Sequence, residues 1–307
     1  MTATGRTVEI GDVELWVEEF GDPDGPPVLL IMGSMSQGHV WPDAFVGRLA
    51  AGGRRVIRYD HRDTGRSTAV DFDAHPYTWT DIRDDAIGLL DALGIGAAHI
   101  VGHSAGGLLG QWIAVTRPER VATLTVIGAS PLGRREGEVV LRALMGEPQD
   151  AGALPPPKAA FTELFQRAAT APPPATRAEY VDFQVEVARV LHGPALPFDA
   201  DAQRAVEERL YDRARVPGSE ANHRRAAAGH PHFEPEDALG GITAPTLVVE
   251  GSEEPVKPGH GRLIAAEIPG AEYLEVPGMG HTLPAEAHAP LAEAVLAHTG
   301  RAAVAAG

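Results

Sequence analysis

Apolar and polar residues follow strand-like patterns in several short runs over the first 130 residues of the chain. From Val13 to Phe20 the two kinds of residue alternate, which is typical of a strand with one exposed face. Val28–Met32 is apolar throughout, as expected of a strand that is buried on both faces. Further strands are predicted at Arg55–Tyr59, His99–Val101 and Ala122–Ile127.

Between these predicted strands, the apolar residues recur at the spacing of a helix. Between Thr80 and Leu93 the apolar residues recur on one helix face, Thr80 is the expected cap, and Gly94 is the expected end. A second helix is expected to begin near Ala105. Short strands that alternate with helices predict a parallel sheet wrapped by right-handed crossovers.

The pattern changes in the middle of the chain, which is rich in proline, alanine and charged residues and shows no clear strand. Helices are expected there at Phe161–Thr170, Arg177–Leu191 and Asp201–Ala214. The alternation then returns with strands at Thr246–Val249 and Tyr273–Val276, a helix at 261–268 and a last helix at Pro290–His298. We therefore expect an α/β core formed by residues 1–130 and 240–300, interrupted by a helical cap at residues 131–239.

Composition excludes several kinds of partner and chemistry. The formal net charge of −16 disfavours nucleic acid and anionic membranes, because both require a basic surface. The chain contains no cysteine, which excludes disulfides, thiolate metal sites and a cysteine nucleophile. No apolar stretch of membrane-spanning length and no secretory signal is seen, so a cytoplasmic location is expected.

The first candidate for chemistry is the segment Gly102-His103-Ser104-Ala105-Gly106, which matches the G-x-S-x-G pattern of a nucleophile elbow. A predicted strand precedes it and a predicted helix follows it, and this is the context that gives the pattern meaning. The two glycines remove side chains that would collide where strand and helix approach each other. Ser104 is therefore the candidate nucleophile, although a tight turn that happens to contain serine would give the same pattern.

A serine nucleophile needs a base, and the order along the chain in this architecture is serine, acid, histidine. His281 is the candidate base, because it lies late in the chain in the glycine-rich loop after the strand Tyr273–Val276. His103 is expected to pack away from the tip of the turn. The run that contains His223, His230 and His232 matches no metal-site spacing and is interpreted as a solvated loop.

The acid should follow the strand Thr246–Val249, where two glutamates and no aspartate stand. Glu254 is favoured over Glu253 because it directly precedes Pro255 and Val256. Either glutamate could instead simply solvate the loop. The role of the acid is to fix the tautomer of the histidine and to stabilise the imidazolium.

The chain resembles the α/β-hydrolase superfamily and, more narrowly, the aclacinomycin methylesterases of anthracycline tailoring. The resemblance covers nearly the whole chain and rests on "GDVELWVEEFGDP", "LLIMGS", "VIRYDHRDTGRST", "VGHSAGG" and "IPGAEYLEVPGMGHTLP". It implies an α/β-hydrolase fold with a mostly parallel central sheet, flanking helices and a helical cap inserted after the sixth core strand. It also implies Ser104 as nucleophile, His281 as base, and Glu254 in the position that aspartate usually holds.

An oxyanion hole needs two donors aimed at the developing charge. One expected donor is the backbone N–H of Ala105, and the resemblance implies the backbone N–H of Ser34 as the other. The segment from Asp60 to Ser67 is expected to brace the top of the sheet. Within the cap, Phe165 and Phe183 are candidate substrate-binding residues, because a pocket for a polycyclic ester requires aromatic walls.

The predicted function is a serine hydrolase that cleaves a carboxylic ester, with a methyl ester of a bulky polyketide implied by the resemblance, through an acyl-enzyme. No metal or organic cofactor is expected, and the partner is a small molecule bound by a monomer or homodimer. The alternative is a non-hydrolytic member of the fold, either a binding protein or a catalyst of biosynthetic rearrangement. C–C bond hydrolases and cofactorless peroxidases also use serine, so the sequence leaves them open as well.

Overall fold

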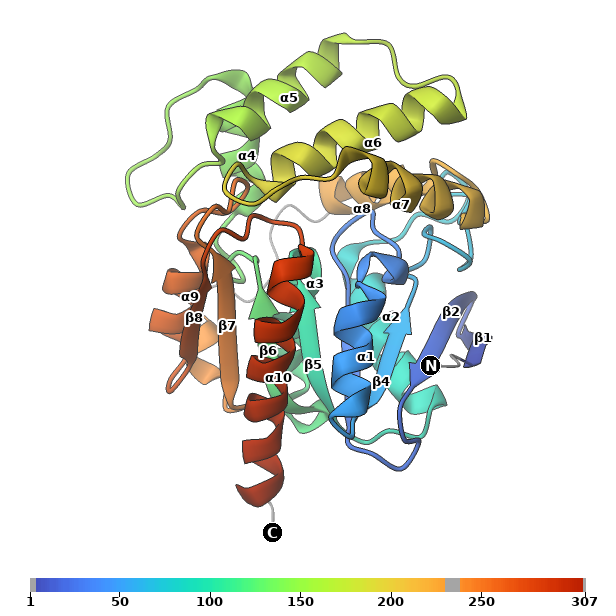
Figure 1. Cartoon of the computed structure of the whole chain (residues 1–307), viewed down its shortest axis with the longest axis vertical. Coiled ribbons are helices and arrows are strands. Elements are labelled where there is room, and N and C mark those ends of the chain that lie inside the picture. The colour runs from blue at the N-terminus through green and yellow to red at the C-terminus, as the bar shows by residue number, and fades with distance from the viewer. Residues whose placement is uncertain (1–3, 230–237, 306–307) are drawn as a thin grey trace.

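A single eight-stranded sheet forms the centre of the computed structural model, which describes residues 4–229 and 238–305 (Figure 1). The strand order is β1-β2-β4-β3-β5-β6-β7-β8, and only the β1–β2 and β2–β4 pairs are antiparallel. The strands are β1 (Thr4–Ile10), β2 (Val13–Phe20), β3 (Pro27–Ile31), β4 (Arg55–Tyr59), β5 (Ala98–His103), β6 (Val121–Ile127), β7 (Thr246–Gly251) and β8 (Glu272–Val276).

Helices cover both faces of this sheet. The helices α1 (Asp43–Ala51) and α10 (Ala285–Ala305) pack together on one face. The other face carries α2 (Trp79–Ala92), α3 (Ala105–Thr116) and α9 (His260–Glu267). Successive residues of β3 enter different clusters, Leu29 and Ile31 the α2–α3 side, Val28 and Leu30 the α1–α10 side. Burial on both faces explains why this strand is apolar at every position.

Between β6 and β7 the described residues form five more α-helices, which gather at the end of the sheet where the parallel strands terminate (Figure 1). They are α4 (Glu136–Met145), α5 (Ala159–Thr170), α6 (Arg177–His192), α7 (Ala200–Arg213) and α8 (Asn222–Gly229). No helix among the described residues is long and apolar enough to cross a membrane.

The sequence pattern located most strands and the longer helices, with three differences. The cap of α2 is Thr78 rather than Thr80, because the backbone N–H and the hydroxyl of Thr78 both donate to the Asp81 carboxylate. Helix α10 begins at Ala285 rather than at Pro290. The pattern did not identify β1 or the helices α1, α4 and α8.

The turn from β5 to α3 places Ser104 alone between a strand and a helix. Its φ of 55° and ψ of −122° lie in a region that side chains rarely adopt. A Cβ on Gly102 would lie 2.2 Å from the carbonyl oxygen of Gly106, and one on Gly106 would lie 2.0 Å from that of Ile31. The two glycines therefore allow the helix to start directly against the sheet.

Replacement of Gly106 with alanine is expected to lower the free energy of unfolding by about 3 kcal/mol, since the backbone of β3 must move to admit the methyl group. Urea unfolding curves measure this loss. The matched control is Gly96→Ala, where an added Cβ would meet nothing within 4 Å. Equal unfolding midpoints for the two variants would show that the close approach at Gly106 does not limit the fold.

Candidate active site

Ser104 stands at the point where the carboxyl end of β5 meets the N-terminus of α3. Its backbone N–H donates to the carbonyl oxygen of Ile127 at 2.8 Å, which ties the turn to the end of β6. The Ser104 side chain is partly exposed. It lies at the N-terminal end of α3, where the first backbone N–H groups of the helix have no acceptor within the helix. An oxygen that gains negative charge here would be stabilised by the helix dipole.

A histidine and a carboxylate meet beside this turn. His281 lies in the loop after β8, and Glu254 lies in the loop after β7. The Nδ1 of His281 is 2.8 Å and 3.0 Å from the two carboxylate oxygens of Glu254, and both side chains are buried. Nδ1–H therefore donates to the carboxylate, which leaves Nε2 as the basic nitrogen of the ring.

The Glu254 carboxylate is held in its charged form. Burial alone would raise the pKa of this group, but His281 and the backbone N–H groups of Val256 and Lys257 lower it to about 2. Those two N–H groups donate to Oε1 at 2.8 Å and 3.2 Å. The acid therefore keeps its charge at neutral pH although only 1% of the residue is exposed.

The neighbouring Glu253 lies elsewhere. Its carboxylate is 3.7 Å from the ammonium of Lys158, and about a third of its side chain is exposed. Of the two glutamates that the sequence offered, the structure thus brings Glu254 to His281 and turns Glu253 towards the helical segment between β6 and β7.

His103, the residue before Ser104, fixes the backbone of the histidine loop. Its Nε2 lies 2.8 Å from the carbonyl oxygen of His281, and its ring packs 4.9 Å from the His281 ring. Burial lowers the pKa of His103 to about 3, so the ring is neutral and donates from Nε2. The expectation that this side chain packs away from the tip of the turn agrees with its burial, and it links β5 directly to the His281 loop.

The loop after β3 passes directly over the serine. A Cβ on Gly33 would lie 3.1 Å from the Cβ of Ser104, so Gly33 permits this close approach. Ser34 is the next residue of this loop after Gly33. Ala105 directly follows Ser104 and is the first residue of α3. The structure therefore brings both predicted oxyanion donors to the neighbourhood of Ser104.

Two buried histidines brace this loop from its two ends. The Nε2 of His61 bonds to the carbonyl oxygen of Met32 at 3.0 Å. The Nδ1 of His223 accepts the backbone N–H of Met35 at 2.9 Å, and its Nε2 bonds to the carbonyl oxygen of Arg62 at 2.9 Å. Met35 itself has a φ of 62°, so the loop adopts a conformation that depends on such contacts.

The interpretation of His223 as part of a solvated loop is wrong. The residue is fully buried on α8, and burial lowers its pKa to about 3, which keeps it neutral. Its spacing of three from the buried Ala226 is the helical signal that the sequence contained. His230 and His232 lie outside the described residues.

The segment from Asp60 to Ser67 bonds to the loops around it, as expected of a brace. The Asp60 carboxylate accepts the backbone N–H groups of Gly38 at 2.8 Å and Arg66 at 3.0 Å, and it pairs with Arg213 of α7. Arg62 forms a buried two-point ion pair with Asp85 of α2.

The two predicted substrate-binding aromatics lie on the helices between β6 and β7. Phe165 is partly buried on α5, where its ring packs 4.6 Å from that of Phe161. Phe183 is partly buried on α6. The structure thus holds both in that helical segment, and their role towards a substrate stays a prediction.

Sequence reasoning also missed Lys257. Its ammonium lies 3.4 Å from the Oγ of Ser104 and 3.1 Å from a carboxylate oxygen of Glu136, the first residue of α4. A lysine in a proline-rich loop carries no pattern that would predict such a contact, because the contact depends on where α4 lies.

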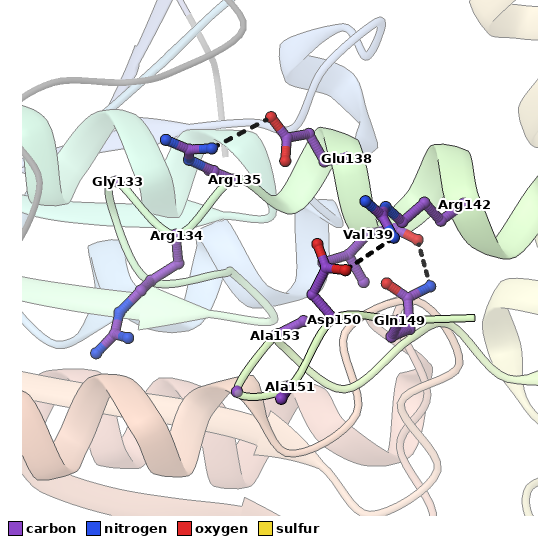
Figure 2. A pocket seen from close by; sticks show the side chains of 11 residues that line it. Gly133, Arg134, Arg135, Glu138, Val139, Arg142, Gln149, Asp150, Ala151 and Ala153 are labelled. Carbon is purple, nitrogen blue, oxygen red and sulfur yellow. Dashed lines mark hydrogen bonds and ion pairs between the residues drawn. The ribbon is translucent and has the colours of Figure 1, made fainter. Parts of the chain in front are cut away.

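A separate cavity of about 300 Å³ opens beside α4 (Figure 2). Its arginines are all paired with carboxylates, Arg134 with Glu267, Arg135 with Glu138 and Arg142 with Asp150. Its lining contains neither Ser104 nor the residues around it. Within the described part of the chain, no group of three or more histidine, aspartate and glutamate residues could hold a metal ion.

Comparison with known proteins agrees with this architecture. Residues 26–287 match the family model described as alpha/beta hydrolase fold. The chain is 40% identical over 300 residues to the rhodomycin D methylesterase DauP of Streptomyces sp. (strain C5), covering 97% of this chain and 99% of that protein. It is 39% identical, with the same coverage, to the rhodomycin D methylesterase DnrP of Streptomyces peucetius.

Among solved structures, a hydrolase from Pseudomonas aeruginosa PA01 superposes with a TM-score of 0.70 at 24% identity, covering 97% of this chain and 98% of the other. That likeness shows the shared fold. The family match spans most of the chain, and the two methylesterases align over nearly their whole length. The protein therefore belongs to the α/β-hydrolase family.

Proposed function

We propose that this protein is a serine hydrolase that cleaves the methyl ester of a bulky aromatic polyketide through an acyl-enzyme. The single observation that carries the chemistry is the buried bond between Glu254 and Nδ1 of His281, placed beside a serine on a strained strand-to-helix turn. The two rhodomycin D methylesterases that resemble the chain support a methyl ester as the substrate.

In the first half of the reaction, Nε2 of His281 takes the proton of Ser104 as the hydroxyl oxygen attacks the ester carbonyl. Glu254 is charged and stabilises the imidazolium that forms. The backbone N–H groups of Ser34 and Ala105 hold the developing oxyanion. The imidazolium then gives its proton to the methoxy oxygen, and methanol leaves.

In the second half, the same imidazole removes a proton from water, and the resulting hydroxide attacks the acyl-serine carbonyl. This attack forms a tetrahedral intermediate. Its collapse breaks the bond between the acyl carbon and Ser104 Oγ, and the oxygen regains its proton from His281. The products are the free carboxylic acid and unchanged enzyme, so the cycle consumes one water and needs no electron donor or acceptor.

The helices between β6 and β7 form a cap, residues 131–239, over the core of residues 1–130 and 240–300. Three of their contacts reach the loops that carry the reacting groups. The backbone N–H of His281 donates to the carbonyl oxygen of Leu191 at 2.6 Å, that of Lys158 donates to Pro255, and His223 accepts from Met35. A substrate must therefore pass this cap to reach Ser104.

Several properties remain predictions from the sequence. Phe165 and Phe183 are proposed to line the pocket for the aromatic part of the substrate. A monomeric or homodimeric state and a cytoplasmic location are further predictions. The alternatives are a non-hydrolytic role, C–C bond hydrolysis and peroxidase activity. Absence of turnover with ester substrates would favour them.

Ser104→Ala is expected to lower kcat for a methyl ester by roughly a thousandfold or more, because the nucleophile and its base act as a unit. The fold should stay intact, since the side chain contributes only a hydroxyl at a partly exposed position. Steady-state kinetics with matched circular dichroism spectra measure both effects. A variant that keeps more than about a tenth of the wild-type kcat would rule out Ser104 as the nucleophile.

Glu254→Gln is expected to lower kcat by roughly a hundredfold or more, because an amide cannot stabilise the imidazolium and can favour the wrong tautomer of His281. The matched control is Glu253→Gln, which removes the same charge one residue away and should cost less than about threefold, as is typical of an exposed ion pair. Equal losses in the two variants would contradict the assignment of Glu254 as the acid.

A further inference from the structure

A buried cation lies against the candidate nucleophile. The ammonium of Lys257 is 3.4 Å from the Oγ of Ser104, and only 5% of the residue is exposed. Burial of an ammonium is costly unless an opposite charge compensates it. The compensating charge is the carboxylate of Glu136 at 3.1 Å, contributed by the first turn of α4 in the cap.

The adjacent lysine favours the charged form of the Glu136 carboxylate. Burial by itself would raise the pKa of Glu136, but the adjacent Lys257 lowers it below its ordinary value. The pair joins α4 to the loop after β7, and Nζ of Lys257 lies within 3.4 Å of both the carboxylate and the Oγ of Ser104.

The acid loop does not need the lysine side chain. Glu254 accepts the backbone N–H of Lys257, a donor that almost any residue at this position would supply. An apolar side chain of similar length would fill the same volume without a desolvation cost. The ammonium is thus unexplained by the packing of the loop and by the orientation of His281.

The position of the ammonium also separates it from the oxyanion donors. Ser34 follows β3 and Lys257 follows β7, and these two strands lie on opposite sides of β5 in the sheet. The carbonyl oxygen of an ester held by the N–H groups of Ser34 and Ala105 therefore faces away from Lys257. What faces the ammonium is another part of the substrate.

We infer that Lys257 is a specificity-determining residue that binds an acidic or enolised oxygen on the acyl group, close to the scissile ester. This inference rests on the proposed function. During attack the carbonyl carbon is bonded to Ser104 Oγ, so an oxygen within hydrogen-bonding distance of Nζ lies only a few bonds from that carbon. The enzyme therefore selects esters with a carboxylate, phenolate or enolate at the β or γ position.

The net charge of the protein explains why a local ammonium would help an anionic substrate to bind. The chain has a formal net charge of −16, and such a field repels anionic substrates. A local ammonium offsets that repulsion where the substrate binds. Glu136 neutralises the ammonium while the site is empty and competes with the substrate oxygen when it is filled.

The test compares two methyl esters of nearly equal shape, monomethyl succinate and methyl 4-methylpentanoate, of which only the first carries a carboxylate. Lys257→Met keeps the length of the side chain and removes its charge. We expect the ratio of kcat/KM for the anionic ester to that for the neutral ester to fall about tenfold or more, mainly through a higher KM. Glu136→Gln should change the same ratio in the opposite direction, because it removes the competing carboxylate.

The matched control is Lys158→Met, which makes the same change of net charge at the cap beside the acid loop and should leave the ratio unchanged. Competitive inhibition by succinate is the readout that does not depend on turnover of the anionic ester, and Lys257→Met should weaken it about tenfold. Thermal melting curves show whether each variant is folded.

An unchanged ratio in folded Lys257→Met would overturn the inference, as would equal shifts in Lys257→Met and Lys158→Met. An equal fall in kcat for both esters would also overturn it, because the lysine would then act on Ser104 rather than on the substrate. Hydrolysis of the neutral ester by the wild-type protein tests the proposed function separately, so the two failures are distinguishable.

Discussion

The close contact between α3 and the sheet is the constraint on which the rest of the site depends. The α carbon of Gly106 lies so near the carbonyl oxygen of Ile31 that no side chain fits between them. This contact forces the chain to turn within one residue, and Ser104 takes the strained conformation at that turn. The serine is consequently held at the carboxyl edge of the sheet, where the loops after β3, β7 and β8 converge.

Those loops are held by buried polar contacts in addition to apolar packing by residues such as Met32 and Met279. His103 holds the backbone of His281, His61 and His223 hold the two ends of the loop that carries Ser34, and backbone N–H groups hold Glu254. Each of these bonds satisfies a polar group that would otherwise be costly to bury. Because His223 and Leu191 belong to helices between β6 and β7, that helical segment helps to position the loops that carry Ser34 and His281.

The parts of this arrangement that depend on local sequence could be predicted. The strand–turn–helix around Ser104 follows from two glycines at fixed spacing, and the buried strand β3 follows from its continuous apolar run. Order along the chain then pointed to His281 and to the pair Glu253 and Glu254, of which the structure brings Glu254 to the imidazole.

The parts that depend on distant contacts could not be predicted. His223 lies 188 residues from the backbone N–H that it accepts, and it stands between Asn222 and two arginines, so the local pattern indicated exposure. Lys257 pairs with Glu136, the first residue of α4, which is distant from it in the sequence. Neither position shows its partner in the sequence, because the partner is brought near only by the packing of the cap on the core.

The central claim is that Ser104, activated by His281 and Glu254, attacks an ester carbonyl. The most direct measurement is labelling with an alkyl fluorophosphonate, followed by mass spectrometry of the intact protein and of its peptides. The account predicts one adduct per chain, located on Ser104, and a much slower reaction in Glu254→Gln. An unlabelled wild-type protein, or an adduct on another residue, would contradict it.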